Sequence, residues 1–294
     1  MSKAEVYPYS SKWISKNHIS FSELKDYYLC PTYHYIKWIL ERGGFKGNQY
    51  TLTGGAVHST NEFLLTEEYE KRKMNLEFFF DEEEIIKFYQ SKFKEEVETF
   101  KEKNPEEYRD LDKKSTIKIF EQCKGLFKNI LKEMKNKFGN YKVIKAEHEL
   151  YQPIEGYNYN FKGFIDLVIQ LEDGKYVIID WKTTSSYWDL QKRTSKETTY
   201  QLTYYKHYYA KEFGIDPKDI STYFVLLKRA VKQDKNIEFI EVPVGPRKIQ
   251  NALEYLDKAV ANILNKKIEQ NHRYCSQCEC YNKLCNGRSI INVK

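Results

Sequence analysis

Two neighbouring segments of the chain carry acidic and basic side chains whose spacing could support metal-ion chemistry. Residues 161–171 and 175–182 are both rich in β-branched and apolar side chains, and residues 172–174, Glu-Asp-Gly, are typical of a hairpin turn between two strands. A three-residue loop with Gly174 in the left-handed region sets Leu171 opposite Lys175. The sequence therefore predicts an antiparallel hairpin in this register.

The predicted register places Asp166 opposite Asp180, and Lys182 shares their face because side chains alternate along a strand. Directly opposed residues have Cβ atoms roughly 4.5–5.5 Å apart, and like charges at that distance destabilise the pair unless something neutralises them. Mg²⁺ or Mn²⁺ would neutralise them, polarise a phosphoryl oxygen and lower the pKa of a bound water. Lys182 would then orient that water or stabilise the transition state.

Two alternatives stay open on these residues alone. Asp180 and Lys182 could be polar residues at the end of a half-exposed strand. A register shift of one residue would also separate Asp166 from Asp180. Motifs elsewhere in the chain are needed to decide between these readings.

The order of the motifs resembles the RecB-like branch of the PD-(D/E)XK nuclease superfamily, in which GxxD on one strand precedes acid-x-Lys on the next. Here the two motifs are Gly163 to Asp166 and Asp180-Trp181-Lys182. The resemblance covers residues 20 to 285. It implies an α/β, restriction-endonuclease-like fold with a mixed central sheet flanked by helices, and metal-dependent hydrolysis of DNA.

Three further motifs of that branch follow the expected order. The GGAVH sequence at residues 54–58 is similar to a GxxxH helix start, and the resemblance implies that His58 joins Asp166 and Asp180 at the metal. An imidazole ligand suits Mn²⁺ better than Mg²⁺. Gln201 and Tyr205 form a QxxxY motif on one helix face, which we interpret as a DNA-positioning pair. The branch often adds a glutamate before GxxD; Glu147 and Glu149 both lie there, and we favour Glu147.

The chain has six cysteines, four of them between residues 275 and 285. In a reducing compartment such spacing is more typical of metal ligands than of disulfides. An early Cys30 followed by this late group resembles the split cysteines of iron–sulfur nucleases, which include AddB-type helicase–nucleases and CRISPR adaptation exonucleases. The resemblance implies a 4Fe–4S cluster held by Cys30, Cys275, Cys278 and Cys285 that joins the two ends of the chain.

The late cysteines depart from the usual spacing, because Cys278 and Cys285 enclose six residues where the family has five. Cys280 lies between them and could replace Cys278. Zinc is the alternative metal, since Cys275, Cys278, Cys280 and Cys285 alone could supply four ligands. Cys123 falls within a helical pattern and is expected to be a buried small hydrophobe.

Composition places few further limits on function. Apolar residues make up 41% and charged residues 31% of 294 residues, which suits a soluble globular protein, and the net charge of +6 permits a basic patch without requiring one. We find no apolar leader and no stretch approaching about 18 apolar residues, so neither export nor membrane insertion is expected. The expected location is the cytoplasm.

Hydrophobic periodicity predicts alternating helices and strands in one large domain. Helices are expected at 82–103, 111–138, 198–213 and 246–267, with another opened by Gly54 and running to residue 72; strands are expected at 142–152, 158–171, 175–182, 222–228 and 238–243. We divide the single nuclease domain, 1–294, into N-terminal helices with the first cysteine (20–58), a helical elaboration (59–138), a nuclease core (139–268) and a cysteine cluster (269–294).

The expected activity is a metal-dependent DNA exonuclease that prefers single-stranded DNA or frayed ends. Its expected partners are DNA and helicase, recombination or CRISPR-adaptation proteins, without a membrane. One alternative is a catalytically silent DNA-binding or scaffold module of a repair or CRISPR-type complex. The other is an RNA-processing nuclease.

Overall fold

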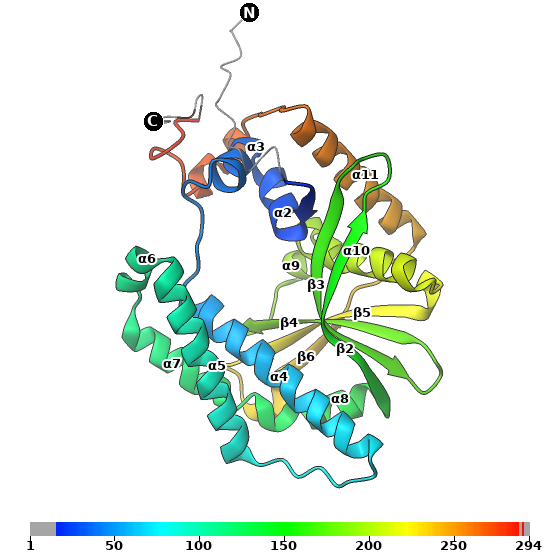
Figure 1. The fold of residues 1–294 in the computed structure, drawn as a ribbon. Coiled ribbons are helices and arrows are strands. Elements are labelled where there is room, and N and C mark those ends of the chain that lie inside the picture. The colour runs from blue at the N-terminus through cyan, green and yellow to red at the C-terminus, as the bar shows by residue number, and fades with distance from the viewer. Residues whose placement is uncertain (1–15, 288–289, 291–294) are drawn as a thin grey trace, which may run out of the picture. The chain divides into compact units, whose positions relative to one another are not determined.

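A computed structural model describes residues 16–287 and residue 290 of the chain (Figure 1). The chain forms two compact units, each built from separate segments. The first unit comprises Met1–Phe45, Tyr151–Gly163 and Gln250–Lys294, and the second comprises Lys46–Leu150 and Phe164–Ile249. The predicted four-part division of a single domain stays a prediction, and its terminal residues 1–15, 288–289 and 291–294 lie outside the described residues.

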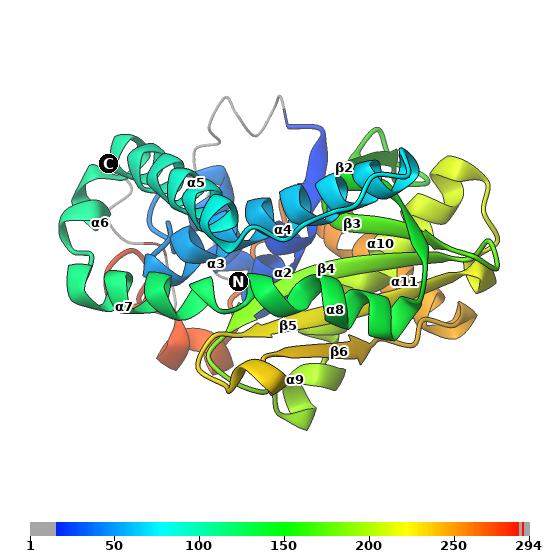
Figure 2. The same cartoon turned by 90° about the horizontal axis from the view of Figure 1, so that it is seen from below.

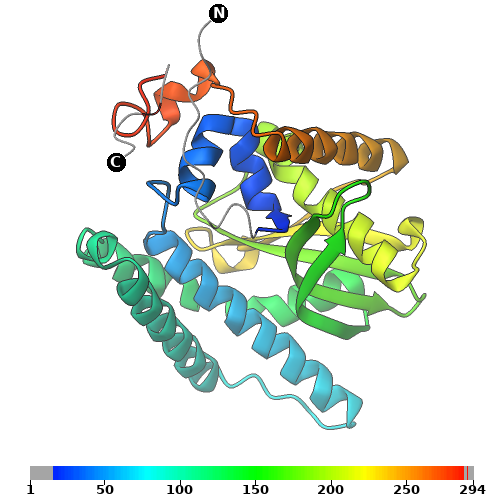
Figure 3. The same cartoon turned by 45° about the horizontal axis from the view of Figure 1, so that its top comes forward.

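The second unit opens with a long helix, α4 (Gln49–Lys73). It begins five residues before the predicted start at Gly54, because Asn48 forms a capping box with Thr51 and so satisfies the first free amides. Helix α5 (Glu82–Lys103) has the predicted bounds, begins at an Asp81 cap and lies beside α4 (Figure 3).

The predicted helix over 111–138 is instead two helices, α7 (Lys113–Lys124) and α8 (Phe127–Phe138), preceded by the short α6 (Pro105–Arg109). Gly125 lies at the break, and glycine is among the poorest helix formers. Leu126 and Phe127, which follow it, are buried in the core of the unit. The interruption covers Gly125 and Leu126 alone, and both keep right-handed helical dihedral angles.

The strands form a mixed sheet flanked by helices, as predicted. Strand β3 (Asn160–Leu171) is antiparallel to β4 (Tyr176–Thr184), β4 is parallel to β5 (Ile220–Lys228), β5 is antiparallel to β6 (Ile237–Glu241), and β2 (Tyr141–Pro153) pairs with β3. The parallel step from β4 to β5 is made through α9 (Leu190–Thr194) and α10 (Lys196–Phe213). Parallel neighbours need such a crossover.

Helices α4 and α8 pack on one face of this sheet, and Figure 2 shows them on the same side of it, while α5 and α7 pack against α4. Val177, Ile179 and Trp181 of β4 point into that core. Because side chains alternate along a strand, Asp180 and Lys182 point to the opposite face, where α10 packs against β4 and β5. The alternation thus separates the core from the polar residues of the hairpin.

The first unit contains β1 (His18–Ser20), parallel to residues 160–162 of β3, followed by α2 (Phe21–Leu29), α3 (Pro31–His34) and a π-helical segment Tyr35–Ile39. Later parts are residues 250–264 of α11 (Pro246–Leu264) and a 3₁₀ segment His272–Gln277. The amide and hydroxyl of Thr32 both donate to the carbonyl of Glu269, at 3.1 and 3.0 Å. None of the helices in the described residues is long and apolar enough to cross a membrane.

Candidate active site

The hairpin of β3 and β4 has the register predicted from its turn. Gly174 has φ +85°, and the amide of Leu171 donates to the carbonyl of Lys175 at 2.8 Å. The paired residues continue to Leu167 and Ile179, where the recorded ladder ends. One further step in the same register opposes Asp166 and Asp180, so the two acids lie where the strands stop pairing.

Asp166 uses its side chain to continue the interaction between the strands. Its Oδ2 accepts a hydrogen bond from the amide of Trp181 at 2.7 Å. Burial nevertheless raises the pKa of Asp166 to about 7, against the lowering effects of Lys182 and the Trp181 amide. The charges of Glu147 and Glu62 raise it further. A carboxyl with this pKa accepts a proton or a cation readily near neutral pH.

Asp180 is the most buried acid of the site, with a side chain only 2% exposed. Its Oδ1 accepts a hydrogen bond from Nε2 of Gln201 at 2.6 Å. Its Oδ2 forms an ion pair with Nζ of Lys182 at 2.5 Å. Burial raises the pKa of Asp180 to about 6, with Asp166 adding to the rise and Lys182 opposing it.

Lys182 is charged and held near both acids. The carboxylates of Asp180 and Asp166 raise its pKa although burial acts in the opposite direction. The predicted grouping of two aspartates and one lysine on one face is therefore present in the structure. The ammonium neutralises part of the charge that the two acids bring together.

His58 of α4 approaches the same acids. Its Nδ1 lies 3.5 Å from Oδ2 of Asp166. Burial lowers the pKa of His58 to about 4, and the charge of Lys182 lowers it further. The imidazole is therefore neutral at physiological pH, which is the state that binds a metal ion.

Two glutamates extend the acidic centre. Burial and the charge of Asp180 raise the pKa of Glu147, the residue preferred from the sequence. Glu147 also has φ +47°, a conformation that non-glycine residues adopt rarely and often at functional sites. Glu62 is not among the residues predicted from the sequence. It lies one turn after His58 in α4, and this spacing is the feature of the sequence that could have identified it.

Gln201 and Tyr205 of α10 lie against the acidic centre. Besides its bond to Asp180, Nε2 of Gln201 lies 3.2 Å from the hydroxyl oxygen of Tyr205. The Tyr205 hydroxyl also accepts from the amide of Phe164, and its side chain is buried. The pair therefore holds Asp180 in place, while the DNA contact predicted for it stays a prediction. Tyr204 and Tyr208 are buried and pack, as expected.

The side chains of the acidic centre are of the types that bind a divalent cation, although their ligand atoms do not point to one common position. Asp166 and Asp180 offer carboxylate oxygens, which Mg²⁺ and Mn²⁺ prefer, and Oδ2 of Asp180 already pairs with the positive charge of Lys182. Within residues 16–287, however, no group of three or more His, Cys, Asp or Glu side chains is arranged so that it could hold a metal ion. The reason is local: Trp181, Gln201 and Lys182 occupy the carboxylate oxygens that a cation would share.

The cysteine cluster lies in the first unit, where five cysteines line one cavity of about 20 Å³. Burial raises the pKa of the Cys285 thiol, and the nearby thiols of Cys30, Cys275 and Cys278 raise it further. All four predicted ligands line this cavity. Backbone amides donate to two of the sulfurs at 3.4 Å, from Asn271 to Cys30 and from Gly287 to Cys285.

Cys280 also lines the cavity but has a different surrounding. It is buried, it hydrogen-bonds to Cys278, and its sulfur accepts from the amide of Gly44. The bond from Cys280 lowers the pKa of Cys278 to about 6, which favours a thiolate at Cys278. The choice of three late ligands stays a prediction.

Cys123 is fully buried in the core of the second unit, as predicted for a small hydrophobe.

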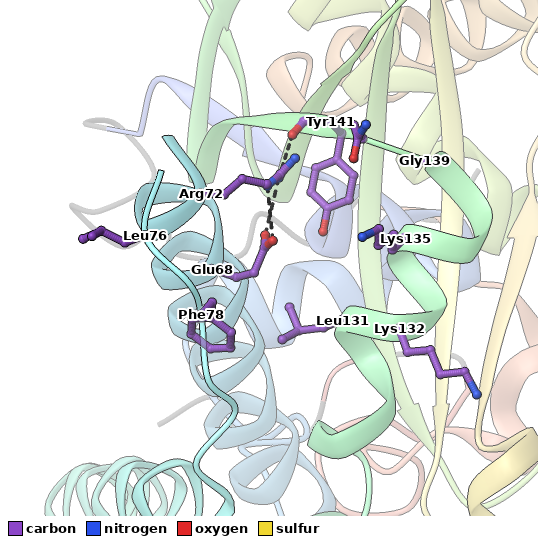
Figure 4. A pocket seen from close by; sticks show the side chains of 10 residues that line it. Glu68, Arg72, Leu76, Phe78, Leu131, Lys132, Lys135, Gly139 and Tyr141 are labelled. Atoms are coloured by element: carbon purple, nitrogen blue, oxygen red, sulfur yellow. Dashed lines mark hydrogen bonds and ion pairs between the residues drawn. The ribbon is translucent and has the colours of Figure 1, made fainter. Parts of the chain in front are cut away.

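A pocket of about 330 Å³ lies at the other end of α4 (Figure 4). Glu68 and Arg72 line it, ten and fourteen residues after His58, or roughly 15–20 Å along the helix axis. Arg72 already donates to the carbonyl of Tyr141 at 2.8 Å and pairs with Glu68 at 3.2 Å. None of the predicted site residues lines this pocket, so pocket size does not identify the acidic centre.

Comparison with known proteins agrees with this geometry. The sequence profile of the PD-(D/E)XK nuclease superfamily matches residues 18–286. A crystal structure described as "Putative exonuclease" from Eubacterium rectale has a TM-score of 0.55 at 15% identity, over 100% of this chain and 95% of that one. The structure of SSO0001 has a TM-score of only 0.36 at 14% identity, over 90% of this chain and 84% of that one, too low to indicate a shared fold. No curated protein matches the chain.

Proposed function

The chain belongs to the PD-(D/E)XK nuclease superfamily, and we propose that it is a metal-dependent DNA exonuclease of the RecB-like type, acting on single-stranded DNA or frayed ends. The observation that carries this proposal is the pair of buried acids, Asp166 and Asp180, opposed where the ladder of β3 and β4 ends. Both have raised pKa values, and Lys182 lies beside them. Charged groups so perturbed are typical of catalytic centres.

Each residue has a distinct role in the proposed reaction. Asp166 and Asp180 hold Mg²⁺ or Mn²⁺, and neutral His58 assists them. When bound there, such a cation would supply polarisation of the phosphodiester and a lowered pKa for a water molecule. Lys182, released from its ion pair with Asp180, positions the water or stabilises negative charge in the transition state. Gln201 keeps Asp180 oriented through its hydrogen bond, and Tyr205 supports Gln201.

The preference for unpaired strands draws support from Phe164. It lies two residues before Asp166 on β3, so both side chains share a face, and Phe164 is 45% exposed. An exposed aromatic ring beside the acids can stack on a base, and a duplex hides its base faces. The similar crystal structure from Eubacterium rectale is described as a putative exonuclease, and that description fits digestion from an end of the strand.

We further propose a 4Fe–4S cluster at Cys30, Cys275, Cys278 and Cys285, with zinc as the alternative. The closeness of these four thiols and the two amide donors to sulfur support it. In either case the metal acts as a structural element, and a cluster that includes Cys30 would also join segments about 240 residues apart in the chain. Helicase, recombination or CRISPR-adaptation proteins are the proposed partners.

The decisive experiment uses end-labelled substrates of one sequence. We expect linear single-stranded DNA to be degraded faster than blunt duplex with Mg²⁺ or Mn²⁺, and closed circular single strands to resist. Equal cutting of circles would make the protein an endonuclease. Faster cleavage of matched RNA would favour RNA processing, and binding without cleavage would favour the scaffold reading. Asp180→Asn is the control for contaminating nuclease.

A further inference from the structure

Arg229 is a partly buried cation for which the described residues supply no carboxylate. It lies just beyond β5, in the second unit, and its amide donates to the carbonyl of Thr184 at 3.0 Å. Within the described residues, the guanidinium of Arg229 forms no ion pair, and its Nε makes no hydrogen bond. A guanidinium withdrawn from water is costly unless an acceptor pairs with it. It follows Lys228, which pairs with Thr184, so Arg229 lies three residues beyond the position opposite Lys182 in the β4–β5 pairing.

An aromatic ring lies beside this cation. The guanidinium carbon of Arg229 is 5.1 Å from the ring centre of Tyr50, in the first turn of α4. The Tyr50 side chain is 48% exposed. A cation next to a half-exposed aromatic ring is the combination that single-stranded nucleic acids use, because the cation meets phosphate and the ring meets a base or sugar.

Gly54 leaves room between this pair and the catalytic centre. It follows Tyr50 by one turn and precedes His58 by one turn in α4. A Cβ added at Gly54 would meet no atom within 4 Å, whereas a Cβ at the adjacent Gly55 would come within 2.5 Å of the Glu96 carboxylate. The Cβ at Gly55 thus meets only the end of a flexible side chain, and the Cβ at Gly54 meets nothing. A glycine within a helix destabilises it relative to alanine, and it is favoured where a ligand approaches the backbone closely.

We propose that Arg229, Tyr50 and the bare helix surface at Gly54 form a subsite for a phosphodiester of the substrate strand next to the catalytic centre. Arg229 donates to the phosphate oxygens, Tyr50 contacts the neighbouring base or sugar, and the strand crosses α4 at Gly54 toward His58. The subsite rests on the proposed function, because the ligand is the strand that the nuclease cleaves. It assigns these three residues to substrate positioning, separate from metal binding.

The test measures binding without cleavage. A 5′-fluorescein single-stranded oligonucleotide is titrated with the full chain in EDTA, and anisotropy gives Kd at several salt concentrations. We expect Arg229→Gln to raise Kd about tenfold and to reduce the slope of log K against log salt by about 0.7, the value for one phosphate contact on a single strand. Tyr50→Leu should raise Kd about fivefold.

Gly54→Ala and Gly55→Ala form a matched pair. Gly54→Ala should raise Kd about fivefold while leaving the thermal midpoint equal or higher, because alanine favours the helix. Gly55→Ala should leave Kd unchanged. If Arg229→Gln lowers the thermal midpoint, Arg229→Lys serves in its place, since it keeps the charge but not the planar contact and should raise Kd less.

The outcomes separate this subsite from the proposed function. If the wild type cleaves DNA but Gly54→Ala and Arg229→Gln bind it with wild-type Kd and salt slope, the subsite is wrong and the nuclease assignment stands. If the wild type binds but does not cleave, and the variants weaken binding as expected, the subsite stands and the activity is wrong. A wild type that binds no oligonucleotide overturns both.

Discussion

The acidic centre and the cysteine cluster both gather residues that are distant in sequence, but they are supported differently. Asp166 and Asp180 sit on paired strands, and each has a protein partner for its charge: the Trp181 amide for one, Gln201 and Lys182 for the other. The late cysteines lie on a 3₁₀ segment and turns, where their main polar partners are one another and a few backbone amides.

The two regions therefore differ in what holds their residues together. The sheet holds the two acids together at the expense of burying their charge, as their raised pKa values show. The cysteine cluster has little regular structure to hold it, so we expect the metal to supply its order. The acidic centre should then matter for activity more than for stability, and the cysteine cluster for stability more than for chemistry.

The largest expected effect is on catalysis. Asp180→Asn keeps the shape of the side chain but removes the charge that holds the cation, and we expect a loss of about a thousandfold or more in cleavage. The thermal midpoint should stay equal or rise, because a buried charge is gone. A time course with labelled single strands, beside thermal denaturation, measures both. Cleavage near the wild-type rate would break the assignment of the metal site.

At the cysteines we expect the main effect on stability and not on cleavage. Cys30→Ser should release the metal and lower the thermal midpoint, whereas Cys123→Ser, in the core of the other unit, serves as a control that retains the metal. Iron analysis of protein purified without oxygen should give about four atoms per chain in the wild type. A colourless protein with one zinc, indifferent to Cys30→Ser, would instead favour the local zinc site.

Lys182→Ala is expected to cost about a hundredfold in cleavage, the size typical for removal of one donor to the transition state. The effect should appear in kcat, with Kd for DNA in EDTA little changed. A loss confined to Kd would make Lys182 a phosphate contact and not part of the chemistry.

A smaller effect is expected from Gln201→Ala, because Gln201 acts through Asp180. Loss of a residue that orients a ligand typically weakens metal affinity about tenfold or more. The midpoint of activation by Mn²⁺ should therefore shift to higher concentration, while kcat at saturating Mn²⁺ is largely restored. DNA affinity measured in EDTA should not change, and a change there would support the direct DNA contact predicted from the QxxxY motif.

The smallest effect concerns pH. Burial raises the pKa of Asp166 to about 7 and of Asp180 to about 6, from 3.8 for an ordinary aspartate. Between about pH 4 and 7 the folded protein therefore binds more protons than the unfolded chain, so these acids reduce the free energy of unfolding as pH rises through that window. In EDTA, the thermal midpoint of Asp166→Asn should fall less over this range than that of the wild type. Identical slopes would contradict the raised pKa values.

Local sequence determined much of the fold and the centre of the site. The Gly174 turn defines the hairpin register, and that register opposes Asp166 and Asp180. Helical spacing likewise determined that His58 lies in a long helix and that Gln201 and Tyr205 share a face. These features depend on a few adjacent residues, so periodicity and turn chemistry were sufficient to predict them.

Tertiary structure alone decided which groups those residues meet. That Gln201 binds Asp180, that Asp166 accepts from Trp181, and that Arg229 reaches Tyr50 of α4 are contacts between elements, which no local pattern encodes. Spacing along the chain specifies which side chains can face one another, but only packing specifies how the donors and charges are finally paired.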